Sequence, residues 1–277
     1  MVAKDKSQSM LSNKDLALAL KSALAAARAA GKVQAKFFRK AFRVDEKKGA
    51  GLVTEVDLKS EELILKKLRR DFPSFSVIGE ESGASRGSST ASGDVPTWHV
   101  DPLDGTTNYA HGFPMYGVSV GLAIGERPIL GVILAPSLQE CWWATRGQGA
   151  FRNGERIRVS PRKSLPDCLL STGFAYMRDK ALQDALGRFR RASLEARAVR
   201  RPGAAALDLA YVAMGVFDGF WERSLNSWDV CAGIALVEEA GGRISDYDLK
   251  DFRFGAREIL ASNGTIHKRL AELLRKA

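Results

Sequence analysis

The segment from Trp98 to Tyr109 constrains the fold more tightly than any other part of this sequence. An apolar stretch typical of a β-strand ends at Asp101, and Pro102 stiffens the turn that leads to a second carboxylate, Asp104. Gly105 and the two threonines after it suit a backbone that approaches an anion closely and then starts a helix. Acidic groups beside such a turn would repel a phosphate unless cations lay between them. The segment therefore predicts a site that holds divalent metal and phosphate together.

Length and composition narrow the class of protein. The 277 residues suffice for one large domain or for two small domains that share a core. Hydrophobic content of 45% and charged content of 27% are ordinary for a soluble globular enzyme, and no apolar run reaches the length that spans a bilayer. Three cysteines, Cys141, Cys168 and Cys231, have wide spacings that indicate neither a disulfide framework nor a zinc site. We therefore expect a protein of the reducing cytoplasm without a membrane partner.

The chain carries a formal net charge of +10, from 42 basic and 32 acidic residues. This excess is compatible with nucleic-acid contact, with attraction of a phosphorylated small molecule, or with solubility alone. Its densest part, residues 188–201, contains six arginines and one glutamate. Such a run is most often a solvated helix face, and it lacks the interleaved aromatic residues of a single-strand platform. Nucleic acid is therefore the secondary expectation for a partner.

Hydrophobic spacing predicts two helices and a strand near the start of the chain. The first helix is capped by Asn13 and runs to about Phe42. The second follows Asp57 and stops at Pro73, because the residue before a proline disfavours the helical conformation. A short strand is expected at residues 74–80.

Later segments alternate between strands and helices. Residues 83–93 are rich in Gly and Ser and are typical of a mobile loop, and residues 117–159 have the alternation of several strands. In the second half we expect strands at 168–171, 243–245 and 258–261, helices at 181–196, 204–214 and 229–240, and a C-terminal helix. This order favours an α+β or layered α/β fold. We divide it into an N-terminal half at 1–160, with most candidate metal ligands, and a C-terminal half at 161–277, together one compact catalytic unit.

Four further acidic residues occur at expected ends of strands or helices, where loop carboxylates can converge. They are Asp57, Glu80, Glu81 and Asp229. Magnesium prefers oxygen ligands, usually one or two carboxylates with water and substrate oxygens completing the shell. Each acid alone also fits an ordinary role: Asp57 or Asp229 as a helix cap, and the two glutamates as a solvated pair. Their occurrence together is what favours a metal site.

With these motifs the sequence resembles the inositol monophosphatase family of magnesium-dependent, lithium-sensitive phosphatases. The matching motifs are Val53–Asp57, Ile78–Ser82, Asp101–Asn108, Gly203–Asp208, Trp228–Gly233 and Glu239–Gly242. The resemblance runs from about the first helix to the C-terminus. It implies the α-β-α-β-α sandwich of the sugar-phosphatase type, and relatives are commonly homodimers.

The resemblance also implies a set of metal ligands for two or three Mg²⁺ ions. Glu80, Asp101 and the backbone carbonyl of Leu103 would hold the first ion, so that Glu80 counts among the catalytic residues. Asp101, Asp104 and Asp229 would hold a second, weaker one. A third would be held mainly by Glu80 and water.

Catalytic and phosphate-binding roles are implied in the same way. The backbone N–H groups of Gly105 and Thr106 would receive the phosphate. Asp57 and Thr106 would orient and deprotonate the attacking water, without a covalent enzyme intermediate. Asp104 and Asp229 would contact the substrate as well as the metal.

Substrate selection rests on fewer residues. Glu222 occurs where relatives use a glutamate to accept hydrogen bonds from a polyol hydroxyl, although it also fits a surface acid. Gly203 and Ala204 match the substrate-side turn, where Ala204 replaces the Ser or Thr of many relatives. Arg200 is a candidate substrate or interface contact, with a solvated charge as the default interpretation.

The resemblance thus implies Mg²⁺-dependent hydrolysis of a phosphomonoester, with myo-inositol 1-phosphate as the representative substrate. Fructose 1,6-bisphosphate, histidinol phosphate and nucleotide 3′-phosphates remain rival substrates on the same scaffold. A non-enzymatic alternative is RNA or transcription-complex binding through the arginine-rich stretch, as in some bacterial members of the family.

Overall fold

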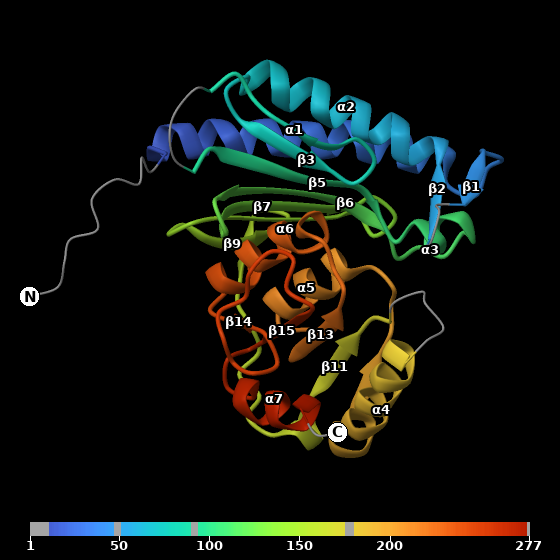
Figure 1. Ribbon diagram of the computed structural model, residues 1–277, viewed down its shortest axis with the longest axis vertical. Helices are drawn as coiled ribbons and strands as arrows, with labels where there is room; N and C mark the ends of the chain where they lie inside the picture. Colours follow the sequence, from blue (N-terminus) through green and yellow to red (C-terminus); the bar gives the residue numbers. More distant parts are fainter. Residues whose placement is uncertain (1–10, 47–50, 90–93, 175–179, 276–277) are drawn as a thin grey trace, which may run out of the picture.

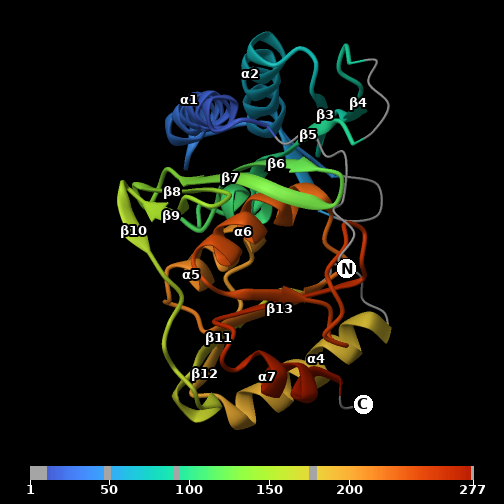
Figure 2. The same cartoon turned by 90° about the vertical axis from the view of Figure 1, so that its left-hand side faces the viewer.

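Five layers of alternating helices and sheets make up the molecule (Figures 1 and 2). The computed structural model describes residues 11–46, 51–89, 94–174 and 180–275. Helices α1 and α2 cover an eight-stranded sheet, α5 and α6 form the central layer, and a five-stranded sheet separates them from α4 and α7. The α-β-α-β-α sandwich expected from the sequence is confirmed. None of the helices in the described segments is long and apolar enough to cross a lipid bilayer.

The helices account for three of these layers. Their bounds are α1 Asn13–Phe37, α2 Glu55–Asp71, α3 Thr106–Ala110, α4 Lys180–Glu195, α5 Ala205–Ala213, α6 Ser227–Glu239 and α7 His267–Arg275, with a 3-10 turn η1 at Leu165–Asp167. Both α5 and α6 are buried on nearly all sides, as a helix between two sheets must be.

The larger sheet has the strand order β10-β9-β8-β7-β6-β5-β3-β4. Its strands are β3 Ser76–Gly79, β4 Gly83–Ser85, β5 Pro96–Asp104, β6 Gly117–Ile124, β7 Arg127–Ala135, β8 Glu140–Thr145, β9 Gly149–Arg152 and β10 Glu155–Ile157. Neighbours are antiparallel except for β3 and β5, which run parallel. The pairing of β5 with β6 shifts register between Asp101 and Asp104. This irregularity re-aims the two carboxylates at the end of the strand.

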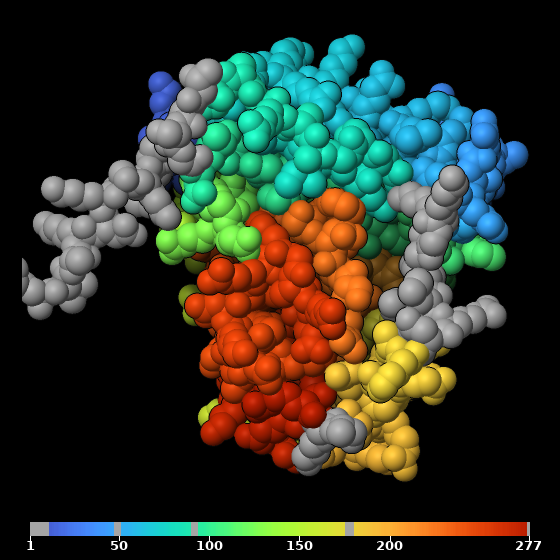
Figure 3. Space-filling view, viewed as in Figure 1, coloured from blue at the N-terminus to red at the C-terminus, as the bar shows by residue number. Residues whose placement is uncertain are grey.

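The smaller sheet has the order β12-β11-β13-β15-β14. Its strands are β11 Leu169–Thr172, β12 Ala198–Arg200, β13 Gly219–Arg223, β14 Arg243–Ser245 and β15 Glu258–Ser262, and a separate pair joins β1 Val44–Glu46 to β2 Leu52–Thr54. In the space-filling view the C-terminal half, yellow to red, packs directly against the N-terminal half, whose blue to green part is visible from this side (Figure 3).

Glycines on the larger sheet bring α6 close to it. A Cβ at Gly131 would lie 2.2 Å from the Ala232 carbonyl oxygen, and a Cβ at Gly121 would lie 2.5 Å from Cys231 Sγ. Any larger residue would push the helix off the strands. The close approach fixes the start of α6, and with it Asp229, relative to the end of β5.

Several local expectations need correction. Ser12, not Asn13, caps α1, and that helix ends at Phe37 rather than near Phe42. Thr54 caps α2, so the helix starts before Asp57, whose carboxylate completes the capping box.

Two stretches that were each expected to form one kind of structure, a loop and a helix face, contain more than one. In the stretch 83–93, residues 83–85 form the edge strand β4, while 90–93 lie outside the described residues. The basic stretch 188–201 is not one helix face, because α4 ends at Glu195 and β12 follows. Strand β13 was not expected, although it lies at the centre of the smaller sheet.

Candidate functional site

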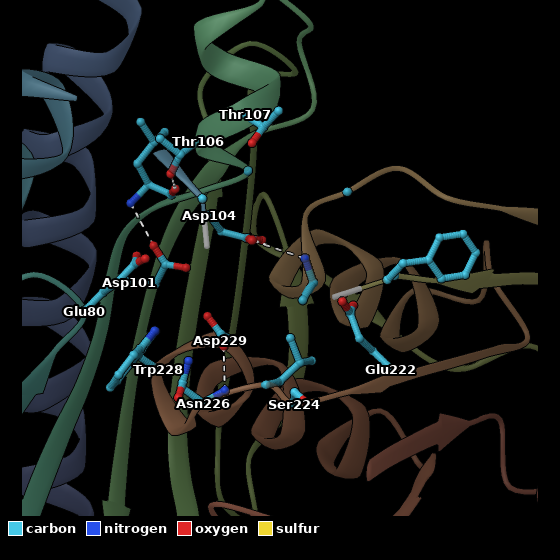
Figure 4. A pocket seen from close by; sticks show the side chains of 18 of the residues that line it. Glu80, Asp101, Asp104, Thr106, Thr107, Glu222, Ser224, Asn226, Trp228 and Asp229 are labelled. Carbon is cyan, nitrogen blue, oxygen red and sulfur yellow. Dashed lines mark hydrogen bonds between the residues drawn. The ribbon is translucent and has the colours of Figure 1, made fainter. Parts of the chain in front are cut away.

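A cavity of about 340 Å³ opens where the larger sheet meets the C-terminal half. Its wall includes five acidic side chains, Glu80, Asp101, Asp104, Glu222 and Asp229. They come from the end of β3, the end of β5, strand β13 and the first turn of α6. Figure 4 shows Asp101, Asp104 and Asp229 directed toward the same space. The structure therefore brings together the acids that the sequence motifs singled out, except Asp57 and Glu81, which are not part of this wall.

Backbone N–H groups hold three of these carboxylates in place. Asp104 accepts hydrogen bonds from the N–H groups of Ala205 at 3.2 Å and Ala206 at 2.8 Å, at the start of α5. Asp101 Oδ1 accepts one from Leu103 at 2.9 Å. Asp229 Oδ2 accepts one from Asn226 at 2.6 Å (Figure 4). These bonds orient the carboxylates without neutralising them.

Burial and mutual repulsion disturb the protonation of the acids. Burial, with repulsion from Glu80, raises the pKa of Asp101 well above its usual range. The pKa of Asp104 rises to about 7 and that of Asp229 to about 8, chiefly through burial and with a contribution from Glu80. Carboxyl groups this close cannot all ionise without a compensating cation. A bound cation would let them ionise together.

The acids do not form a closed metal cage by themselves. Among the described residues, no three His, Cys, Asp or Glu side chains are arranged as a ready cluster for an ion. A cation here would therefore need backbone carbonyl, water or substrate oxygens to complete its shell, which is the usual coordination of Mg²⁺. The all-oxygen donor set fits such a hard divalent ion.

Thr106 connects the cavity to a buried carboxyl group behind it. Its Oγ1 lies 3.0 Å from Asp57 Oδ1 and 3.0 Å from the Leu103 carbonyl oxygen, to either of which it can donate. Asp57 does not line the cavity itself and is fully buried. Burial raises its pKa to about 6, against the hydrogen bonds from Thr54. A carboxyl group poised there can exchange a proton near neutral pH.

The substrate-side residues are only partly at the cavity. Glu222 and Gly203 line it, and burial and the neighbouring Asp229 raise the pKa of Glu222 to about 8. Ala204 is buried and caps α5 with its backbone, while its neighbours form the wall. Arg200 is exposed and lies outside the wall, which instead contains Arg201.

Two residues that support the site were missed at the level of sequence. Glu61 of α2 accepts the backbone N–H groups of Glu81 at 2.9 Å and Ser82 at 2.8 Å, and so fixes the loop that carries Glu80. Arg201 stacks on Phe174, with its guanidinium 5.7 Å from the ring centre. An acid on an otherwise apolar helix face was the available signal for Glu61, and no local pattern distinguishes Arg201 from its neighbour.

Comparison with known proteins agrees with this geometry. The sequence profile of the inositol monophosphatase family matches residues 15–277. An inositol monophosphatase of Mesembryanthemum crystallinum is 42% identical over 270 residues, which cover 97% of this chain and 100% of that protein. The Nus factor SuhB of Pseudomonas aeruginosa is 45% identical over 235 residues, covering 82% and 85%. The crystal structure of extragenic suppressor protein suhB from Bartonella henselae superposes with a TM-score of 0.88 at 37% identity, covering 94% and 99%. The chain belongs to the inositol monophosphatase family.

Proposed function

We propose that this chain hydrolyses a phosphomonoester of a polyol with the help of Mg²⁺, with myo-inositol 1-phosphate as the representative substrate. One observation carries the proposal: Glu80, Asp101, Asp104 and Asp229, from three separate parts of the chain, line one cavity beside Gly105. The relative named an inositol monophosphatase supports the same assignment.

Two or three Mg²⁺ ions fit the oxygen-rich wall. Glu80, Asp101 and the Leu103 carbonyl would hold the first, Asp101, Asp104 and Asp229 the second, and Glu80 with water a third. Bound Mg²⁺ would supply positive charge to the phosphate and leaving oxygens and make the attacking water more acidic. The pKa values of Asp104 and Asp229 are raised chiefly by burial and further by repulsion from Glu80, and a bound cation would offset both effects.

Groups of the protein itself would supply the proton acceptor and the phosphate-binding turn. Asp57, through Thr106, would take the proton of the attacking water, and its pKa near 6 suits a base at neutral pH. The backbone at Gly105 and Thr106, which lines the cavity, would receive the phosphate. Water would attack phosphorus, and the ester P–O bond would break with its electron pair going to the alcohol oxygen. That oxygen would take a proton from solvent, and Asp57 would release to solvent the proton that it had accepted.

Glu222 and Gly203 would face the alcohol part of the substrate. Glu222 would accept hydrogen bonds from polyol hydroxyl groups, and the backbone of Gly203 and Ala204 would form the adjoining wall. Arg200 stays a weaker candidate for substrate contact than Arg201, because only Arg201 lines the cavity.

Release of inorganic phosphate with and without Mg²⁺ tests the proposal. Asp101→Asn should abolish turnover of myo-inositol 1-phosphate. Asp251→Asn is the control and should leave turnover unchanged, because Asp251 is exposed and does not line the cavity. Full turnover by the Asp101→Asn enzyme would refute the metal-dependent mechanism. Parallel assays with fructose 1,6-bisphosphate, histidinol phosphate and a nucleotide 3′-phosphate would identify the preferred substrate.

Family resemblance supports three finer properties. We propose inhibition by lithium, assembly as a homodimer and a cytoplasmic location. Lithium titration of the phosphatase reaction and light scattering of the purified protein test the first two.

A second candidate function is RNA or transcription-complex binding, which the relative named Nus factor SuhB and the basic stretch favour. Part of that stretch already has partners: Arg188 and Arg191 donate to carbonyls of α7, and Arg197 pairs with Asp167. Arg190 and Arg200 are exposed, and Arg200 donates only to the carbonyl oxygen of its neighbour Val199 among the described residues. Binding of structured RNA that weakens steeply with added salt would support this function, and salt-independent or absent binding would oppose it.

A further inference from the structure

Asn108, a half-buried residue of α3, contacts two distant segments of the chain through one amide group. Its Nδ2 donates to the carbonyl oxygens of Met115 at 2.7 Å, Pro202 at 2.9 Å and Gly203 at 3.3 Å. An Asn amide carries two N–H bonds, which are shared here among three backbone carbonyl groups. Met115 precedes β6 of the N-terminal half, whereas Pro202 and Gly203 precede α5 of the C-terminal half. The amide of Asn108 therefore joins the two halves directly behind the phosphate turn.

Residues 202–206 are held at both ends by side chains of one short segment, 104–108. Asn108 binds the carbonyl groups at the start of 202–206, and Asp104 accepts the N–H groups of Ala205 and Ala206 at its end (Figure 4). Ala204 caps α5 without a side-chain hydrogen bond, so the start of α5 depends on these distant partners. The two contacts have opposite polarity: Asn108 donates and Asp104 accepts. Neither side chain can take the place of the other.

The two turns that Asn108 joins lie in contact with each other. A Cβ at Gly105 would lie 3.3 Å from the Cβ of Ala204, and a Cβ at Gly203 would lie 3.4 Å from Asn108 Nδ2. Gly105 and Gly203 both line the cavity, whereas Asn108 does not. A shift of the amide would therefore change the distance between the phosphate side and the alcohol side of the cavity.

We propose that Asn108 is a positioning residue for substrate selection: its amide fixes the spacing between the phosphate turn at Gly105 and the turn at Gly203 that faces the alcohol part of the ester. This inference rests on the proposed function, because it requires the two turns to bind the two parts of one ester. Asn108 touches neither part. When its amide is lost, Asp104 keeps its own hydrogen bonds to α5, so the metal site is retained while the alcohol side shifts.

Steady-state kinetics of the Mg²⁺-loaded enzyme test the selectivity. The two substrates are myo-inositol 1-phosphate and 4-nitrophenyl phosphate, which has no hydroxyl groups besides those of its phosphate. N108D replaces the amide with a carboxylate of the same shape, which the carbonyl oxygens repel. The ratio of kcat/KM for the inositol ester to that for the aryl ester should fall about tenfold, chiefly through KM for the inositol ester. Equal losses for both esters, or an unchanged ratio, would overturn the proposal.

N263D is the matched control for this comparison. Asn263 is a buried amide whose Nδ2 donates to Ser160 Oγ at 3.0 Å and to the Arg162 carbonyl oxygen at 2.8 Å, and it does not line the cavity. The substitution removes hydrogen bonds of the same kind, so N263D should keep the wild-type ratio even where it lowers both rates. A ratio that falls equally in N263D and N108D would mean that general loosening of the fold causes the change, and would refute the specific role of Asn108.

Hydrogen exchange of backbone N–H groups, measured by mass spectrometry, tests the contact without using activity. Peptides that cover residues 203–206 should exchange about tenfold faster in N108D than in wild type, the order expected for a lost hydrogen bond. Peptides that cover residues 226–229 should be unchanged. Equal exchange at 203–206 would overturn the proposal.

N108A removes the amide without adding charge, and it supplies the same comparisons if N108D fails to fold. If the wild-type enzyme hydrolysed neither ester, only the proposed function would be refuted, because exchange at 203–206 would still decide whether Asn108 fixes the turn.

Discussion

Thr106 and Asp57 are joined by a hydrogen bond of 3.0 Å between Thr106 Oγ1 and Asp57 Oδ1, across 49 positions of sequence. The other carboxyl oxygen, Asp57 Oδ2, accepts the backbone N–H of Thr54 at 2.8 Å. The capping box of α2 therefore orients the carboxyl group that reaches the cavity wall through Thr106. A structural cap and a candidate proton acceptor are the same residue.

Removing the Thr106 hydroxyl should impair turnover more than binding. Thr106→Val keeps the shape of the side chain but breaks the link to Asp57, and we expect kcat to fall about 100-fold with little change in KM. Thr106→Ser keeps the hydroxyl and is the matched control, with kcat near wild type. Equal kcat values for the two variants in a phosphate-release assay would exclude the Asp57–Thr106 pair as the proton acceptor.

Glu61 should control metal affinity although it does not line the cavity. Its carboxylate accepts the N–H groups of Glu81 and Ser82, and thereby holds Glu80 in position. We expect Glu61→Gln to raise the Mg²⁺ concentration for half-maximal activity about tenfold, as for other supports of metal ligands.

Glu62→Gln supplies the control for this prediction, since Glu62 is the exposed neighbour on the same helix. Metal titrations of both variants and of the wild type give the comparison. An unchanged requirement for Mg²⁺ in Glu61→Gln would show that the loop keeps its position without this carboxylate.

Gly105 cannot be replaced without strain at the phosphate turn. Its φ is +84°, and a Cβ there would lie 2.7 Å from the Met115 carbonyl oxygen. Gly154 has a φ of +91° but open space around it. We expect Gly154→Ala to cost about 1 kcal/mol of unfolding free energy and Gly105→Ala about 3 kcal/mol, because only the latter adds a clash. Urea unfolding measures both, and equal costs would mean that the turn at Gly105 relaxes freely.

Local periodicity was sufficient to predict most helices and strands. It failed where tertiary contacts determine the end of a helix or the existence of a strand. The apolar spacing of α1 continues past Phe37, yet the chain leaves the helix at Phe38 because that ring packs on Tyr109 and Tyr116. Strand β12 contains an exposed arginine and exists through its pairing with β11. Such pairings depend on distant residues, which a single-sequence pattern does not contain.

The residues of the candidate site likewise include some that local sequence predicts and others that depend on tertiary contacts. Asp101 and Asp104 could be predicted because one short segment contains both carboxylates, the proline and the glycine. Glu61 could not, because its importance comes from a loop that folds against it. The charge state of a buried acid follows from its neighbours in space rather than in sequence.

Acid should destabilise the fold partly through His267. This histidine is 1% exposed, and its ring nitrogens contact the hydroxyls of Ser245 and Ser262, each at 2.8 Å. Burial, with a contribution from Arg243, lowers its pKa from 6.5 to about 4. The unfolded chain therefore binds a proton between these two values that the folded protein does not. The contribution of neutral His267 to the free energy of unfolding is complete above pH 6.5 and is lost progressively as the pH falls to about 4.

His267→Gln should flatten this pH dependence. Relative to wild type, the unfolding free energy of the variant should change by about 3 kcal/mol less between pH 6.5 and pH 4. His111→Gln is the control, because His111 is exposed and should leave the slope unchanged. Some dependence will persist in His267→Gln, since burial lowers the pKa of His99 to about 4 as well. Urea unfolding at several pH values measures the slopes, and a variant slope equal to that of wild type would mean that His267 protonates in the folded protein without cost.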